Sequence, residues 1–152
     1  MVRVSSRAGV TPRFEESLEQ QALIAWSDLA VIPEGPLAGQ KVGRFLFSIP
    51  NGSYLAGDGK QRAMRAGILK REGMRPGVHD LFLMVPRYDW HGLFIEMKRE
   101  KGGQASKGQR QFAETAEMAG YLPALAHGCE QAVECIIVYL NGKGLPDKCR
   151  FS

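Results

Sequence analysis

The chain has 152 residues, a size at which one domain can bury a core without disulfides or structural metals. Its composition is that of an ordinary globular protein, with 44% hydrophobic and 24% charged residues. The net charge of +4 suggests a polyanionic partner without establishing one. No stretch approaches the roughly 20 apolar residues of a membrane span, and no apolar run follows the first Arg residues, so we expect neither a membrane anchor nor a signal peptide.

Three cysteines, Cys129, Cys135 and Cys149, lie late in the chain and form no CxxC pair. The histidines do not supply zinc partners at a suitable spacing. A sparse, odd number of cysteines is typical of a reducing compartment. We therefore expect a soluble, cytoplasmic protein.

The first part of the chain predicts a polar arm over residues 1–13 and a helix from Phe14 to Ala30. Glu19 lies at the border of the apolar stripe of this helix. Glu15 and Glu16 fall near the first turn, where negative charge suits the helix dipole, and we interpret both as solvated. The stripe that we expect to face the core consists of Leu18, Ala22, Ala25, Trp26 and Leu29.

The next part predicts a loop from Ile32 to Gly43, a strand from Arg44 to Ile49 and a turn at Pro50–Gly52. A second helix is expected from Gly57 to Gly73, with Ala63, Met64, Gly67 and Ile68 facing inward. Its other faces are basic, and they are either solvated or in contact with phosphates. These basic residues are Lys60, Arg62, Arg65, Lys70 and Arg71.

Two apolar strands joined by a polar turn are predicted within Gly77–Lys98. A glycine- and lysine-rich loop leads to a helix over 106–120, in which Ser106 is a good N-cap and Gly120 a good stop. A strand over 121–127 and a helix over 128–140 follow. The side chains expected to face inward from these two helices are Phe112, Ala113, Ala116, Met118, Val133, Ile136, Ile137 and Leu140.

The order of these elements predicts an α/β fold, with one mixed sheet flanked by helices. The domain is expected over residues 14–141, with a tail of unassigned role over 142–152.

Three charged side chains interrupt the two apolar strands. Strand side chains alternate between faces, so Glu96 and Lys98 share a face, and in a hairpin Asp80 lies at the same end. Two such carboxylates repel each other unless a proton or a cation lies between them. Oxygen ligands suit Mg²⁺ or Mn²⁺, and the lysine can stabilise charge on a phosphate. The alternative is a surface hairpin with an ordinary salt bridge, although apolar residues on both strand faces favour burial.

The spacing D-x15-E-x-K resembles the PD-(D/E)XK nuclease motif, and the chain resembles the small stand-alone VRR-NUC proteins of phages and bacteria. That resemblance covers about Glu19 to Leu140. Six blocks in the right order carry it, namely Glu19-Gln-Gln with Trp26, Ile49-Pro-Asn-Gly52, Leu69-Lys-Arg-Glu-Gly73, Gly77-Val-His-Asp-Leu81, Leu93-Phe-Ile-Glu-Met-Lys98 and Ser106-Lys-Gly-Gln109.

The resemblance implies a restriction-endonuclease-like core and a set of site residues. Asp80, Glu96 and the main-chain carbonyl of Met97 would bind Mg²⁺ or Mn²⁺, and Lys98 would be the catalytic lysine. Glu19 would reach the same metal, and Gln109 would position water or phosphate. The residues expected to contact DNA are Asn51, Lys60, Arg62, Lys70, Arg71 and Arg75.

The resemblance also implies a homodimeric nuclease that cuts branched DNA, such as a Holliday junction or a flap, in a bacterial cytoplasm. A general or restriction-type endonuclease and a DNA-binding or assembly module without turnover remain alternatives. The family usually has proline before the aspartate, where this chain has His79. That histidine is either passive or an added ligand or phosphate contact.

Overall fold

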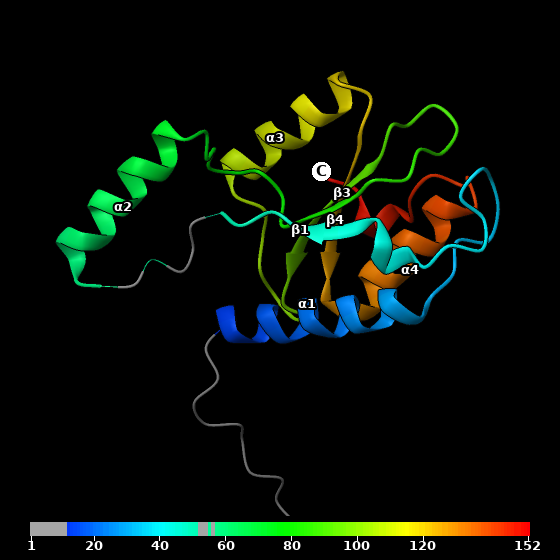
Figure 1. The fold of residues 1–152 in the computed structure, drawn as a ribbon, viewed down its shortest axis with the longest axis horizontal. Coiled ribbons are helices and arrows are strands. Elements are labelled where there is room, and N and C mark those ends of the chain that lie inside the picture. Colours follow the sequence, from blue (N-terminus) through cyan, green and yellow to red (C-terminus); the bar gives the residue numbers. More distant parts are fainter. Residues whose placement is uncertain (1–11, 52–54, 56) are drawn as a thin grey trace, which may run out of the picture.

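A single mixed sheet of four strands is the centre of the computed structural model (Figure 1). The structure describes residues 12–51, 55 and 57–152. Strands β1 and β2 are antiparallel, as are β2 and β3, whereas β3 and β4 are parallel. The strands, in their order across the sheet, are β1 (Leu46–Ser48), β2 (Leu81–Leu83), β3 (Leu93–Lys98) and β4 (Leu122–His127). The predicted mixed α/β sheet is confirmed.

The described residues also form four α-helices, of which α3 lies on one side of the sheet and α1 and α4 on the other (Figure 1). They are α1 (Pro12–Leu29), α2 (Gly59–Arg71), α3 (Lys107–Met118) and α4 (Gly128–Leu140). Short 3-10 helices form at Val42–Arg44 and Asp147–Cys149. The predicted order of helices and strands is confirmed. The first strand is shorter than expected, because the 3-10 helix includes Arg44. None of the helices in the described part combines the length and apolar character of a membrane span.

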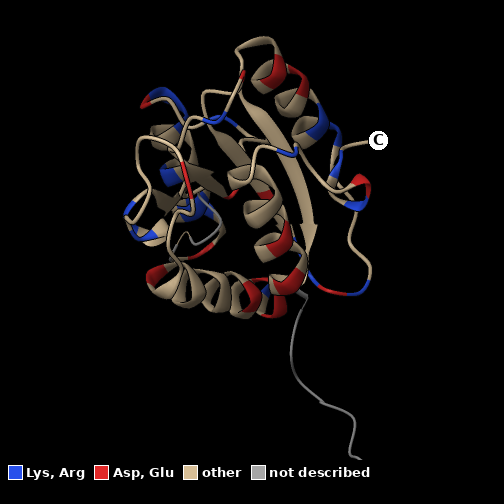
Figure 2. Cartoon of the chain, turned by 90° about the vertical axis from the view of Figure 1, so that its right-hand side faces the viewer, with Lys and Arg blue, Asp and Glu red and all other residues tan. Residues whose placement is uncertain are grey.

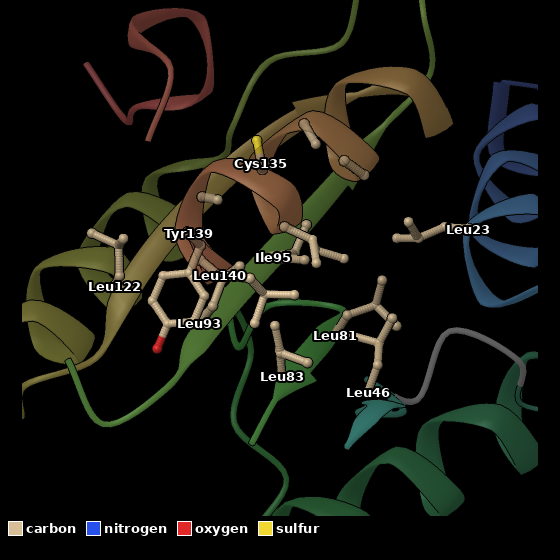
Figure 3. Close-up of a cluster of buried hydrophobic side chains, with 14 of the residues drawn as sticks. Leu23, Leu46, Leu81, Leu83, Leu93, Ile95, Leu122, Cys135, Tyr139 and Leu140 are labelled. Atoms are coloured by element: carbon tan, nitrogen blue, oxygen red, sulfur yellow. The ribbon is translucent and has the colours of Figure 1, made fainter. Parts of the chain in front are cut away.

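The main core lies between the sheet and the helices α1 and α4 (Figure 3). The odd-numbered residues of β3, Leu93 and Ile95, are fully buried there, next to Leu81 and Leu83 of β2. From α4, the hydroxyl of Tyr139 donates to the carbonyl of Val85 over 2.7 Å, so this polar group is satisfied inside the core. The core thus fixes β2 and β3 in one register.

The inward face of α1 differs from the predicted stripe. Leu23 and Ser27 are fully buried, whereas Leu18 is 45% and Leu29 76% exposed. Ser27 can be buried at little cost because its hydroxyl donates to the carbonyl of Ile24 over 2.7 Å. A prediction based on apolar residues alone therefore placed the stripe wrongly.

The predicted burial of α2 is also wrong. No residue of α2 is buried, with Met64 62% and Ile68 39% exposed, and the helix extends away from the sheet (Figure 1). Its N-terminus is defined locally, because Asp58 accepts a hydrogen bond from the amide of Gln61 over 2.9 Å. In the other helices, Met118 is 82% and Ile137 46% exposed, against expectation, because each lies on the solvent side.

The tail that the sequence left unassigned packs against the body. Leu145 and Cys149 are buried, and Leu145 is 7% exposed. At the other end, most of the predicted arm lies outside the described residues, and α1 begins at Pro12.

Candidate active site

The β2–β3 hairpin brings Asp80 beside the end of β3. Leu81 pairs with Ile95, so Asp80, one residue earlier, lies next to Glu96 and Met97. The Oδ2 atom of Asp80 accepts a hydrogen bond from the amide of Met97 over 2.8 Å. Its carbonyl accepts another from the amide of Ile49, which ties Asp80 to the end of β1. Both the backbone and one carboxylate oxygen of Asp80 are therefore fixed.

Glu96 is buried, at 2% exposure, and its two oxygens differ in their surroundings. Oε1 accepts from Nζ of Lys98 over 3.1 Å and from Nε2 of Gln109 over 2.5 Å. Oε2 is also buried but has no hydrogen-bond partner among the residues that the structure describes. A buried acceptor of this kind is costly unless a ligand, a proton or water completes it.

The pKa values of the two carboxyl groups are both raised. Burial raises the pKa of Glu96 to about 8, and the negative charge of Asp80 adds to this effect while Lys98 opposes it. Burial likewise raises the pKa of Asp80, and the charge of Glu16 contributes in the same direction. The pair therefore retains a proton near neutral pH in the absence of a cation.

This donor set fits a hard divalent cation. Two carboxylates, one of which has an oxygen without a partner in the described residues, are ligands that Mg²⁺ and Mn²⁺ accept, with water and substrate phosphate as the others. Within residues 12–51, 55 and 57–152, no group of three or more His, Cys, Asp and Glu side chains is close enough to enclose a metal. The protein would thus supply few ligands and leave room for a phosphate, as Mg²⁺ sites commonly do.

Gln109 is held from several directions. Ser106 caps α3, its hydroxyl accepting from the amide of Gln109 over 3.2 Å, while Oε1 of Gln109 accepts from the amide of Ser106 over 2.7 Å. The remaining side-chain group, Nε2, donates to Glu96. The capping box therefore fixes the Oε1 end of this amide.

Helix α1 supplies a carboxylate that the sequence analysis had interpreted as solvated. Glu16 lines a cavity of about 1020 Å³ together with Asp80 and Met97. Glu19 instead accepts a hydrogen bond from the amide of Cys129 over 2.6 Å, at the N-terminus of α4. The spacing from Glu16 to Gln20, which also lines the cavity, is the signal that could have indicated this face.

The cavity extends from Asp80 and Glu16 toward α2. Asn51 lines it, and its side-chain amide donates to the carbonyl of Val78, two residues before Asp80. Leu69 and Met74, at the end of α2, form part of the opposite wall. The structure thus places Asn51 beside the candidate site.

The basic residues that the sequence assigned to DNA binding lie on α2, whose Leu69 lines this cavity, and just after it. Lys and Arg are spread over several elements (Figure 2), and α2 carries five of them: Lys60, Arg62, Arg65, Lys70 and Arg71. All five are exposed, as is Arg75, whose guanidinium donates to the carbonyls of Lys70 and Met74.

Comparison with known proteins identifies the fold. No protein-family model matches the chain, and no curated protein sequence matches it. A solved structure, a VRR_NUC domain protein, matches with a TM-score of 0.67 at 21% sequence identity, over 90% of this chain and 97% of that one. At this identity the likeness concerns the fold, and it confirms the fold expected from the six sequence blocks. The chain has the fold of a VRR_NUC domain protein.

Proposed function

We propose that the protein is a Mg²⁺- or Mn²⁺-dependent endodeoxyribonuclease that hydrolyses phosphodiester bonds. The observation that carries this proposal is the pair of half-buried Asp80 and buried Glu96. Oε2 of Glu96 has no partner within the described ranges, and Lys98 lies 3.1 Å from the other oxygen. Two carboxylates beside a lysine suit phosphoryl chemistry, in which negative charge increases toward the transition state.

The residues proposed to hold the metal are Asp80, Glu96 and the main-chain carbonyl of Met97. A bound Mg²⁺ or Mn²⁺ would act as a Lewis acid on the phosphate and its leaving oxygen. From α1, Glu16 is the better candidate for a contact through water, because it shares the cavity with Asp80. Glu19 had this role in the sequence analysis, but its Oε2 is engaged with Cys129.

Lys98 and Gln109 are proposed to act on the reacting groups. The Lys98 side chain is 12% exposed and its ammonium donates to Glu96, so this group can also hold a phosphate oxygen at the same place. Gln109 keeps Glu96 oriented and can donate to water or phosphate.

Branched DNA cut by a homodimer is the proposed substrate and assembly, and this part rests on the resemblance to small VRR-NUC proteins. One domain of this size has one site, so two symmetric cuts require two copies. The exposed basic residues of α2 support contact with DNA phosphates through Lys60, Arg62, Lys70 and Arg71. Asn51, which lines the cavity, and Arg75, just after α2, are proposed to contact DNA as well.

The test is incubation of the protein with a labelled four-way junction, a flap and a linear duplex, in Mg²⁺, Mn²⁺ or EDTA. The proposal expects cleavage that depends on metal and is faster on a branched substrate, with Glu96→Ala inactive. Equal rates on linear duplex support a general or restriction-type endonuclease. If Glu96→Ala cuts as well as the parent, the site assignment is wrong.

A DNA-binding module without turnover is the second candidate, favoured by the exposed basic surface of α2. Asp80→Ala separates the two functions. A nuclease loses cleavage in this variant but keeps DNA binding, or binds more tightly because a negative charge near the phosphates is lost. A binding module keeps its full effect.

A further inference from the structure

His79, the residue before Asp80, is enclosed by aromatic rings. It is fully buried, and its ring stacks on that of Phe151, with centroids 4.8 Å apart and an interplanar angle of 7°. Phe112 of α3 meets the same ring edge-on at 4.7 Å.

The His79 ring makes a directed hydrogen bond to α3. Its Nε2 lies 3.1 Å from the main-chain carbonyl of Gln109, and a carbonyl oxygen only accepts, so Nε2 carries the proton and donates. The side chain of Gln109 in turn donates to Glu96 over 2.5 Å. His79 is thus bonded to the residue that holds Glu96, while being covalently joined to Asp80.

The end of the described chain is attached at the same point. Arg110, next to Gln109, donates through Nη1 to the main-chain carbonyl of Ser152, and Phe151 stacks on His79. Cys149 anchors this segment in the core, at 0% exposure. Two consecutive residues of the tail therefore contact the immediate neighbours of Asp80 and Gln109.

We propose that Phe151 and His79 form a positioning clamp, which sets the place of the Gln109 side-chain amide on Glu96 and thereby the metal affinity of the site. This inference rests on the proposed function only in taking Glu96 as a metal ligand. If His79 is instead a passive filler of the space under α3, changes at Phe151 alter stability alone.

The test uses the full chain with Phe151→Ala and, as matched control, Leu145→Ala. The control removes a buried side chain of the same segment but leaves the ring stack on His79 in place. Two quantities are measured: the ¹H–¹⁵N signal of the Gln109 side-chain amide in metal-free protein, and the Kd for Mn²⁺ by calorimetry. The clamp predicts a shifted amide signal and a Kd about tenfold higher for Phe151→Ala, in the range found for residues that support metal ligands. Leu145→Ala lowers the melting temperature and leaves both quantities unchanged.

His79→Phe is the second variant, because it keeps an aromatic ring for stacking and removes the Nε2 donor. It is expected to weaken Mn²⁺ binding as well. Phe151→Tyr keeps the ring that stacks on His79, and it is expected to have the parent's amide signal and Kd for Mn²⁺. If Phe151→Ala fails to fold, Phe151→Leu takes its place. Folded variants with the parent's amide signal and Kd overturn the clamp.

Failure of the clamp differs from failure of the proposed function. If the parent binds Mn²⁺ but cuts no DNA, and Phe151→Ala binds Mn²⁺ more weakly, the nuclease proposal is wrong and the clamp is supported. If the parent cuts DNA and Phe151→Ala has an unchanged Kd for Mn²⁺, only the clamp is wrong. A parent that binds no Mn²⁺ overturns both.

Discussion

The side-chain amide of Gln109 donates to Oε1 of Glu96 over 2.5 Å, and this contact joins α3 to β3 at the candidate site. It directs one oxygen of Glu96 toward protein donors and leaves the other without a partner in the described part of the chain. This oxygen therefore stays available as a ligand, and burial raises the pKa of Glu96 to about 8. The carboxyl groups of Asp80 and Glu96 therefore retain a proton near neutral pH when no cation is bound.

The stability of the metal-free protein is predicted to fall as pH rises from about 4.5 to about 8. The ordinary pKa of Glu96 is 4.5, and its folded value is about 8, so between these limits the folded state binds more protons than the unfolded state. The loss is on the order of 1 kcal/mol per pH unit at most. Thermal melting across this range in EDTA measures it, with Glu96→Gln as the control in which the slope should become smaller. A melting temperature that rises over the same range contradicts the raised pKa.

Metal binding is predicted to release a proton below pH 8, since the cation replaces the proton held by Asp80 and Glu96. Affinity for Mn²⁺ should increase from pH 6 to pH 8 and then level off. Calorimetric titration in two buffers of different ionisation enthalpy gives the number of protons released. If the observed heat does not depend on the buffer, no carboxyl proton is displaced.

Glu16 and Glu19 of α1 are predicted to have separate roles. Glu16→Ala should weaken Mn²⁺ binding and cleavage, because this side chain lines the cavity with Asp80. Glu19→Ala should instead lower the free energy of unfolding by about 1 kcal/mol, the usual effect of losing a hydrogen bond to the amides at a helix N-terminus, since Glu19 accepts from Cys129 at the start of α4. Urea unfolding and calorimetry on both variants decide between them. The reverse outcome would restore the role that the sequence analysis gave to Glu19.

These assignments show which parts of the site follow from sequence. Strand alternation and the turn between β2 and β3 are local, so they correctly placed Asp80 beside Glu96, and the Ser106 cap was equally readable. The orientation of α1 could not be predicted from the sequence, because Glu16 and Glu19 are only about 60° apart around a helix. A buried Ser27, bonded to its own helix, shifts the inward face without any apolar signal.

The tail could not be placed from sequence for a different reason. Phe151 stacks on His79, a residue distant in the chain, and no periodic pattern predicts such a contact. The sequence similarly predicted a buried face for α2 from Met64 and Ile68, but the tertiary structure offers this helix no surface that buries them. Local propensity and capping can define a helix without determining what it packs against.

The exposed cations of α2 are predicted to contribute to DNA affinity through phosphate contacts. Lys70→Ala and Arg71→Ala should each weaken binding similarly for all DNA sequences and reduce the slope of log K against log salt by about 1. Lys143→Ala is the matched control, because it removes an exposed lysine that is not on α2. Fluorescence anisotropy with Glu96→Gln protein, from 50 to 200 mM salt, measures the slopes without cleavage. If the α2 variants and the control have the parent's slope, DNA does not contact this helix. The cations that bind the DNA backbone then lie on other elements.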